Sequence, residues 1–123
     1  MDNNIERIDM FLCKARELLN SNSFDLVPRK KNIDSIKSSG LTIKHVKDII
    51  HDLSYKNYYR GPTSDFGYGR EGYVWEFGYN VDGIEFYIKL KIEERLGRQC
   101  LICLSFHVAK YPLDYPYGGV ERC

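Results

Sequence analysis

Five side chains with useful chemistry are predicted to share one face of a sheet in this 123-residue chain. They are a carboxylate, a phenol, an ammonium, a hydroxyl and an imidazole, namely Glu76, Tyr87, Lys89, Ser105 and His107. An imidazole titrates near neutral pH, so it can take or give a proton, and a carboxylate can take one from a hydroxyl. An ammonium group offsets negative charge that grows on a phosphate. This set suits transesterification of RNA, in which a ribose 2′-OH attacks the adjacent phosphate.

Three strands are expected to position these side chains, because successive residues of a strand point to opposite faces of the sheet. The strands read YVWEFGYN (73–80), IEFYIKLKI (84–92) and CLICLSFH (100–107). The last is apolar on both faces and is therefore expected at the centre of the sheet. We expect the bulkier apolar side chains to face a layer of helices: Trp75, Phe77, Phe86, Ile88, Leu90, Ile102, Leu104 and Phe106.

Helical patterns precede the strands. Apolar residues recur at helical spacing between residues 4 and 20, and Thr42 is a suitable N-cap for a helix that ends near Leu53. A brief helix is expected over residues 32–38, after a short extended piece at FDLVP (24–28). The expected fold is one α+β domain over residues 1–123. Its N-terminal helices (about 4–54) pack on one face of a small antiparallel sheet (73–108).

Two segments lack a regular pattern. The stretch 55–72 is predicted to be a long loop, because it is interrupted by Gly61, Pro62, Gly67, Gly69 and Gly72. The tail, residues 109–123, contains Pro112 and Pro116 and is expected to lie extended across the sheet. Tyrosines allow two interpretations in each segment. Those of the tail either line the site or cover a sheet edge (Tyr111, Tyr115 and Tyr117). Those of the loop either stack on bases (Tyr55, Tyr58 and Tyr59) or, for Tyr55 and Tyr59, seal the end of the second helix.

The composition limits the possible classes of protein. A hydrophobic fraction of 43% and a charged fraction of 28% are typical of a globular domain. The net charge of +1 gives no strong general attraction to nucleic acid. No apolar run approaches the ~20 residues that a membrane helix needs. The polar N-terminus argues against a signal peptide, so we expect a cytoplasmic protein.

Cys100 and Cys103 form a C-x-x-C pair, which can indicate a metal or redox site. Residues three apart on a strand point to opposite faces, so the two sulfurs are not expected to bind one metal ion. The chain has no second pair to complete a four-ligand site. We therefore predict no metal and no cofactor.

Four sequence segments follow one another along the chain: LSYKNYYRGPTSD (53–65), YVWEFG (73–78), IEFYIKLKI (84–92) and CLSFHVAKYPLDYPY (103–117). This order resembles the MqsR-type branch of the small RelE-like toxins of bacterial type II toxin–antitoxin systems. It is most similar to a subgroup with a Gly-Pro loop. The resemblance covers most of the chain from about residue 32 onward. It implies a metal-independent endoribonuclease that cleaves single-stranded mRNA and is held in check by a cognate antitoxin protein.

The resemblance also implies site residues. The family's loop Tyr-Lys pair falls on Tyr59 and Arg60, and its polar residue after the strand tryptophan falls on Glu76. Its strand tyrosine falls on Tyr87, and its basic residue after Ser-Phe falls on His107. Because a guanidinium stays charged, Arg60 shifts proton transfer toward Glu76 and His107. The predicted catalytic residues are thus Arg60, Glu76, Tyr87 and His107, with substrate contacts from Tyr59, Arg70, Lys89, Ser105 and Tyr117.

A second function stays open at this point. The exposed face of a sheet is polar whether or not it does chemistry, and a lone histidine is often structural. The alternative is a non-catalytic module that binds a protein partner through the same face. The near-neutral charge favours the module, whereas Glu76, Lys89 and His107 on one face favour the enzyme.

Overall fold

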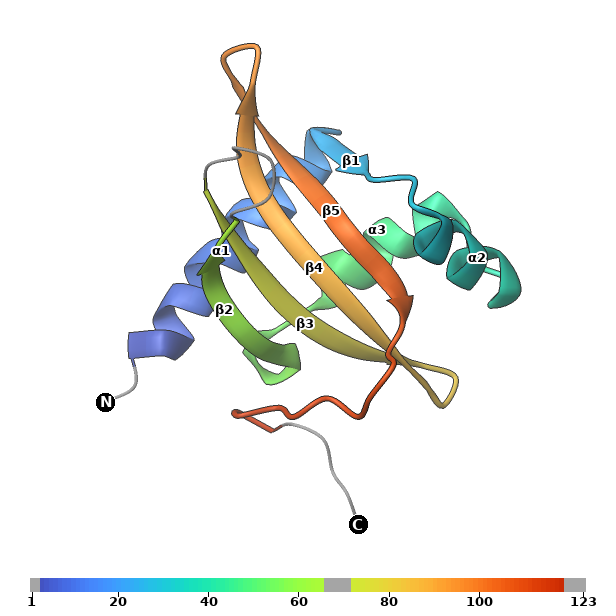
Figure 1. The fold of residues 1–123 in the computed structure, drawn as a ribbon. Coiled ribbons are helices and arrows are strands. Elements are labelled where there is room, and N and C mark those ends of the chain that lie inside the picture. Colours follow the sequence, from blue (N-terminus) through green and yellow to red (C-terminus); the bar gives the residue numbers. More distant parts are fainter. Residues whose placement is uncertain (1–2, 66–71, 119–123) are drawn as a thin grey trace.

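A computed structural model describes residues 3–65 and 72–118 of the chain (Figure 1). The helical elements of these residues are α1 (Asn3–Asn20), α2 (Lys30–Ser38), α3 (Ile43–Asp52) and the 3-10 turn η1 (Tyr55–Asn57). The strands are β1 (Phe24–Leu26), β2 (Tyr58–Ser64), β3 (Tyr73–Val81), β4 (Ile84–Arg95) and β5 (Arg98–Val108). Helices packed against a mostly antiparallel open sheet make an α+β fold, and this fold class agrees with the sequence prediction.

The strands form one sheet in the order β1-β5-β4-β3-β2. β1 and β5 run parallel, and the other neighbouring pairs are antiparallel. The sequence predicts a loop over residues 55–72, and this is wrong for residues 58–64, which form the edge strand β2. The Gly61-Pro62 pair that suggested a loop lies at the register shift of this strand between Arg60 and Thr63. Edge strands and bulges are the places where a sheet tolerates proline.

The core lies between the helices and one face of the sheet (Figure 1). The helical spacing predicted for α1 and α3 is confirmed, because their apolar stripes are buried in this core. Thr42 is the predicted N-cap of α3, and its hydroxyl accepts the backbone N–H of His45 at 3.3 Å. Fully buried side chains from both layers meet here: Ile8, Leu12, Val46, Ile50, Phe77, Phe86, Ile88 and Leu90.

The alternation of side chains in β5 is broken by a bulge. Ser105 pairs with Lys89, but Cys103 pairs with the next residue of β4, so Leu104 is an extra residue in β5. As a result Ile102 and Leu104 pack with Val74 on the face away from the helices. The prediction that Ile102 and Leu104 face the helices is therefore wrong. Residues beyond the bulge return to the predicted alternation, and Phe106 lies in the helix-side core.

Asn32 of α2 binds the backbone at this bulge. It is fully buried, and its Nδ2 donates to the carbonyl oxygens of Val27 at 2.8 Å and Leu104 at 3.1 Å. Its Oδ1 accepts the backbone N–H of Phe106 at 2.9 Å. β1 pairs with β5 only as far as Cys103. Beyond that residue the Asn32 side chain supplies the hydrogen bonds to β5 that a longer β1 would supply.

The tail lies across the open face near the β3–β4 turn, as the sequence predicts (Figure 1). The carboxylate of Glu85 in β4 accepts the backbone N–H of Leu113 at 3.1 Å and the hydroxyl of Tyr115 at 2.6 Å. Both side chains lie over Gly78 of β3. A Cβ at Gly78 would come within 2.1 Å of the Tyr115 hydroxyl and 2.7 Å of Leu113, so no larger residue fits there without displacing the tail.

Candidate active site

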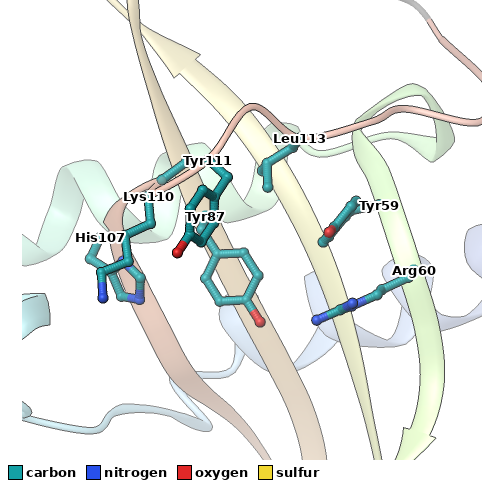
Figure 2. Close-up of a pocket in the computed structure, with 8 residues that line it drawn as sticks. Tyr59, Arg60, Tyr87, His107, Lys110, Tyr111 and Leu113 are labelled. Carbon is teal, nitrogen blue, oxygen red and sulfur yellow. The ribbon is translucent and has the colours of Figure 1, made fainter.

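One cavity of about 180 Å³ opens on the sheet face away from the helices, between the strands and the tail (Figure 2). Three strands contribute to it, with Arg60 from β2, Tyr87 from β4 and His107 from β5. Tyr87 and His107 are direct partners in the sheet, and their ring centroids lie 5.4 Å apart. The remaining lining residues are Tyr59 of β2 and Ala109, Lys110, Tyr111 and Leu113 of the tail.

Glu76 is buried next to this cavity and binds two of its lining residues, Arg60 and Tyr87. It is only 3% exposed and does not line the cavity itself. One of its carboxylate oxygens accepts the Nε–H of Arg60 at 2.9 Å, and the other accepts the hydroxyl of Tyr87 at 2.5 Å. Both oxygens are thus engaged by groups that do line the cavity. The arrangement fixes where the guanidinium and the phenol point.

Tyr87 is held as a neutral phenol. Burial raises the pKa of Tyr87 well above its usual value of about 10, and the hydrogen bond to Glu76 raises this pKa further. The nearby Arg60 guanidinium acts in the opposite direction but does not overcome these effects. The Tyr87 side chain therefore contributes a hydroxyl rather than a titrating acid near neutral pH.

Arg60 presents a fixed positive charge to the cavity. The hydrogen bond to Glu76 raises the pKa of Arg60 above its already high usual value. The guanidinium carbon lies 4.9 Å from the centroid of the Tyr59 ring, a cation–π distance. The next residue is Gly61, at φ +116°, where a Cβ would come within 2.7 Å of the Val74 carbonyl oxygen. Only glycine suits this position, and it lets β2 bend next to Arg60.

His107 contributes an imidazole to the lining of the cavity. Its Nδ1 lies 3.0 Å from the carbonyl oxygen of Val108, which can only accept a hydrogen bond. In the neutral ring this contact places the proton on Nδ1 and leaves the lone pair on Nε2. The ring is half-buried at the end of β5, beside Tyr87 (Figure 2). The geometry provides a proton acceptor, a neutral hydroxyl and a cation around one small hollow.

Comparison with protein families gives a match to the family described as "Motility quorum-sensing regulator, toxin of MqsA", over residues 9–108. The match covers most of the chain. The chain belongs to this family. It is therefore a toxin of a toxin–antitoxin system, and the MqsR-type resemblance seen in the sequence is confirmed. Comparisons with curated proteins and with solved structures found no match.

Not every residue predicted for the site of this MqsR-family chain lies at the cavity. Tyr59, Arg60, Tyr87 and His107 line it, and Glu76 supports it from below. The others predicted as substrate contacts do not line it: Lys89 is half-buried on the same face, Ser105 is 2% exposed, and Tyr117 packs 5.8 Å from the Tyr58 ring. Arg70 lies outside the described residues.

Sequence reasoning missed three lining residues of the tail, Ala109, Lys110 and Leu113. Tyr111, whose two possible roles the sequence left open, lines the cavity. A lysine three residues after the strand-ending His107 was the available signal for a second cation. The family match ends at residue 108, so the tail that closes the cavity lies outside the matched range.

The described cysteines do not form a shared site. Cys103 is buried in the helix-side core, and Cys100 packs with the apolar cluster on the other face. The expectation that the C-x-x-C sulfurs point to opposite faces is confirmed. Across residues 3–65 and 72–118, no group of three His, Cys, Asp or Glu side chains is arranged to hold a metal ion. No helix in this part of the chain is long and apolar enough to cross a membrane.

Proposed function

We propose that this MqsR-family toxin is an endoribonuclease that cleaves single-stranded mRNA by transesterification. The observation that carries the proposal is the convergence of His107, Tyr87 and Arg60 on one cavity. In the reaction the ribose 2′-oxygen bonds to the adjacent phosphorus and the bond from phosphorus to the 5′-oxygen breaks. The products are a 2′,3′-cyclic phosphate and a 5′-hydroxyl.

Each group at the cavity has a role in this reaction. Neutral His107 takes the proton of the 2′-OH on Nε2, and the leaving 5′-oxygen takes a proton from solvent. Arg60 stabilises the negative charge that develops on the phosphoryl oxygens. The Tyr87 side chain lines the cavity and donates its hydroxyl hydrogen to Glu76, and Glu76 orients Arg60 and Tyr87. These groups do the chemistry without a metal ion, as the family resemblance implies.

The proposed partners follow from the family. Its description names its members as toxins of MqsA, so we propose that a cognate antitoxin binds this chain and restrains it. The substrate is mRNA, and the proposed place of action is the cytoplasm.

Purified protein and a mixed-sequence RNA test this function directly. The parental chain should produce fragments that end in 2′,3′-cyclic phosphate. His107→Ala should reduce the cleavage rate by about 10²- to 10⁴-fold, because general acid–base catalysis contributes that much. Arg60→Ala should cause a loss of similar order through charge stabilisation. His51→Ala is the matched control, because His51 is an exposed histidine of α3 outside the cavity.

The same proteins can be expressed from an inducible promoter in bacteria. Growth arrest with RNA fragmentation is expected for the parent and for His51→Ala, but not for His107→Ala. Intact RNA at full expression of the parent would exclude the ribonuclease and leave the non-catalytic interaction module. Parental cleavage rates in both His107→Ala and Arg60→Ala would show that the reaction centre lies elsewhere.

A further inference from the structure

A second cavity adjoins the candidate active site at the end of β5. Its volume is about 300 Å³, and it lies between α2, the end of β5 and the start of the tail. His107 and Lys110 line both cavities, so the His107 side chain lies between the two cavities. The other lining residues of the second cavity are Lys31, Asp34, Ser35 and Val108.

The second cavity carries two lysines that lack a counter-ion. Lys31 and Lys110 are exposed, and within residues 3–65 and 72–118 neither forms an ion pair. The one carboxylate of the cavity, Asp34, is paired with Lys30 at 2.6 Å, which offsets its charge. The cavity therefore presents uncompensated positive charge beside the imidazole.

Ser35 adds a hydrogen-bond donor to these cations. Its Oγ accepts the backbone N–H of Val108 at 3.1 Å, which uses one lone pair and leaves the hydroxyl hydrogen to point elsewhere. Two ammonium groups and a hydroxyl are a suitable set for a phosphate, because lysine binds phosphate as a point charge with three donors.

We propose that this second cavity, the flanking subsite, binds the phosphodiester next to the one that is cleaved. The inference rests on the proposed ribonuclease function and assigns Lys31 and Lys110 as phosphate contacts. A single strand of RNA crosses His107, with its reacting phosphate beside Arg60 and its neighbouring phosphate between the two lysines. In a chain whose net charge is only +1, such local cations supply the attraction to RNA that the molecule as a whole does not.

Binding of a non-cleavable RNA tests the flanking subsite. The probe is a fluorescent decamer of randomised sequence in which every ribose is 2′-O-methylated, so the attacking hydroxyl is blocked. Its affinity for the full-length protein is measured by fluorescence anisotropy over a range of salt concentrations. Lys31→Gln and Lys110→Gln should each weaken binding severalfold. Each should also reduce the slope of log K against log salt by about 0.7, the value for one lost single-strand phosphate contact.

Lys37→Gln is the matched control for this experiment. Lys37 is exposed on the same helix as Lys31 but lines neither cavity, so its variant should keep the parental affinity and slope. In a cleavage assay with the unmodified decamer, Lys31→Gln should raise KM and leave kcat unchanged, because a flanking contact is made equally in the ground state and the transition state.

The outcomes separate the flanking subsite from the ribonuclease function. If the parent binds and cleaves RNA while Lys31→Gln and Lys110→Gln keep the parental affinity and slope, the flanking subsite is wrong and the ribonuclease stands. The subsite is equally wrong if Lys37→Gln weakens binding as much as Lys31→Gln, since the weaker binding would then result from the loss of any positive charge on α2. If the parent neither binds nor cleaves the decamer, both proposals fail together.

Discussion

Glu76 and Arg60 form an ion pair in which the carboxylate is buried and the guanidinium is exposed. The Glu76 side chain is 4% exposed and the Arg60 side chain 62%, with 2.9 Å between the carboxylate and Nε. A catalytic base must reach the proton that it removes. Glu76 does not line the cavity, and its second oxygen is occupied by Tyr87. We therefore propose that Glu76 is a positioning residue and that His107 is the base.

Glu76→Gln distinguishes these two roles. The amide keeps the size of the side chain but loses the charge that holds Arg60. We expect cleavage to fall by about 10- to 100-fold, the usual result of misplacing a catalytic group. His107→Ala should cost more, about 10²- to 10⁴-fold, because it removes the base itself. If Glu76→Gln loses more cleavage activity than His107→Ala, the roles are reversed.

Tyr87→Phe tests the buried phenol through alkaline unfolding. Burial and Glu76 raise the pKa of Tyr87 above the value near 10 that it has in the unfolded chain. Above about pH 10 the unfolded chain releases this proton while the folded chain keeps it, so the free energy of unfolding falls as pH rises. The contribution of this one group is at most about 1.4 kcal/mol per pH unit, and it is constant below about pH 9.

The variant lacks the phenol, so Tyr87→Phe should lose less stability than the parent between about pH 9 and pH 11. Urea unfolding at a series of pH values measures the difference. Tyr73→Phe is the control, since Tyr73 is 60% exposed at the start of β3 in the same sheet. Parallel stability curves for the parent and Tyr87→Phe would contradict the assignment.

Local alternation predicts which side chains share a face wherever a strand is regular. β3 and β4 pair without interruption from Val74 to Val81, so the predicted faces of Trp75, Glu76 and Tyr87 all agree with the structure. Alternation does not predict how deeply a side chain is buried. Lys91 lies on the predicted open face, yet it is 1% exposed. Its ammonium group lies 3.5 Å from Glu93, and Asp65 pairs with it at 2.9 Å. That contact joins residues 26 positions apart and leaves no local pattern.

The features missed by sequence reasoning depend on such distant contacts. The bulge at Leu104 is bound by Asn32, which is 72 residues away in the chain. The edge strand β2 contains glycine and proline, which taken alone predict a loop. The tail takes its place from Glu85 and from the space above Gly78. A single sequence shows each of these residues but not the pairing between them.

Gly78→Ala tests whether the tail belongs to the reaction centre. The new methyl group would occupy space that Tyr115 and Leu113 fill, so the tail should be displaced, at a cost of about 1–3 kcal/mol for overpacking. Limited proteolysis at Lys110 and Tyr111 should become faster, and the cleavage of RNA should fall because these residues line the cavity.

Tyr115→Phe provides a milder version of the same change. It keeps the ring and removes only the hydrogen bond to Glu85, so a smaller effect in the same direction is expected. A Gly78→Ala protein with increased proteolysis of the tail and unchanged RNA cleavage would show that the tail covers the sheet without serving the site.

Asn32→Ala tests the link between α2 and the bulge that precedes His107. The substitution leaves the carbonyl oxygens of Val27 and Leu104 and the N–H of Phe106 without their buried partner. Each unsatisfied group costs about 1–3 kcal/mol, so the midpoint of urea unfolding should fall clearly. Asn32→Asp should cost more, because it brings a buried charge toward two carbonyl oxygens.

Ser35→Ala is the control for this experiment. Ser35 also accepts a backbone N–H of β5, from Val108, but at an exposed position where water can replace it, so the loss should be within about 0.5–1 kcal/mol. Since the bulge sets the face on which the rest of β5 places its side chains, Asn32→Ala should also cleave RNA more slowly at temperatures where it is fully folded. If Asn32→Ala is destabilised yet cleaves at the parental rate, the bulge is held by the sheet alone, and α2 contributes stability without orienting His107.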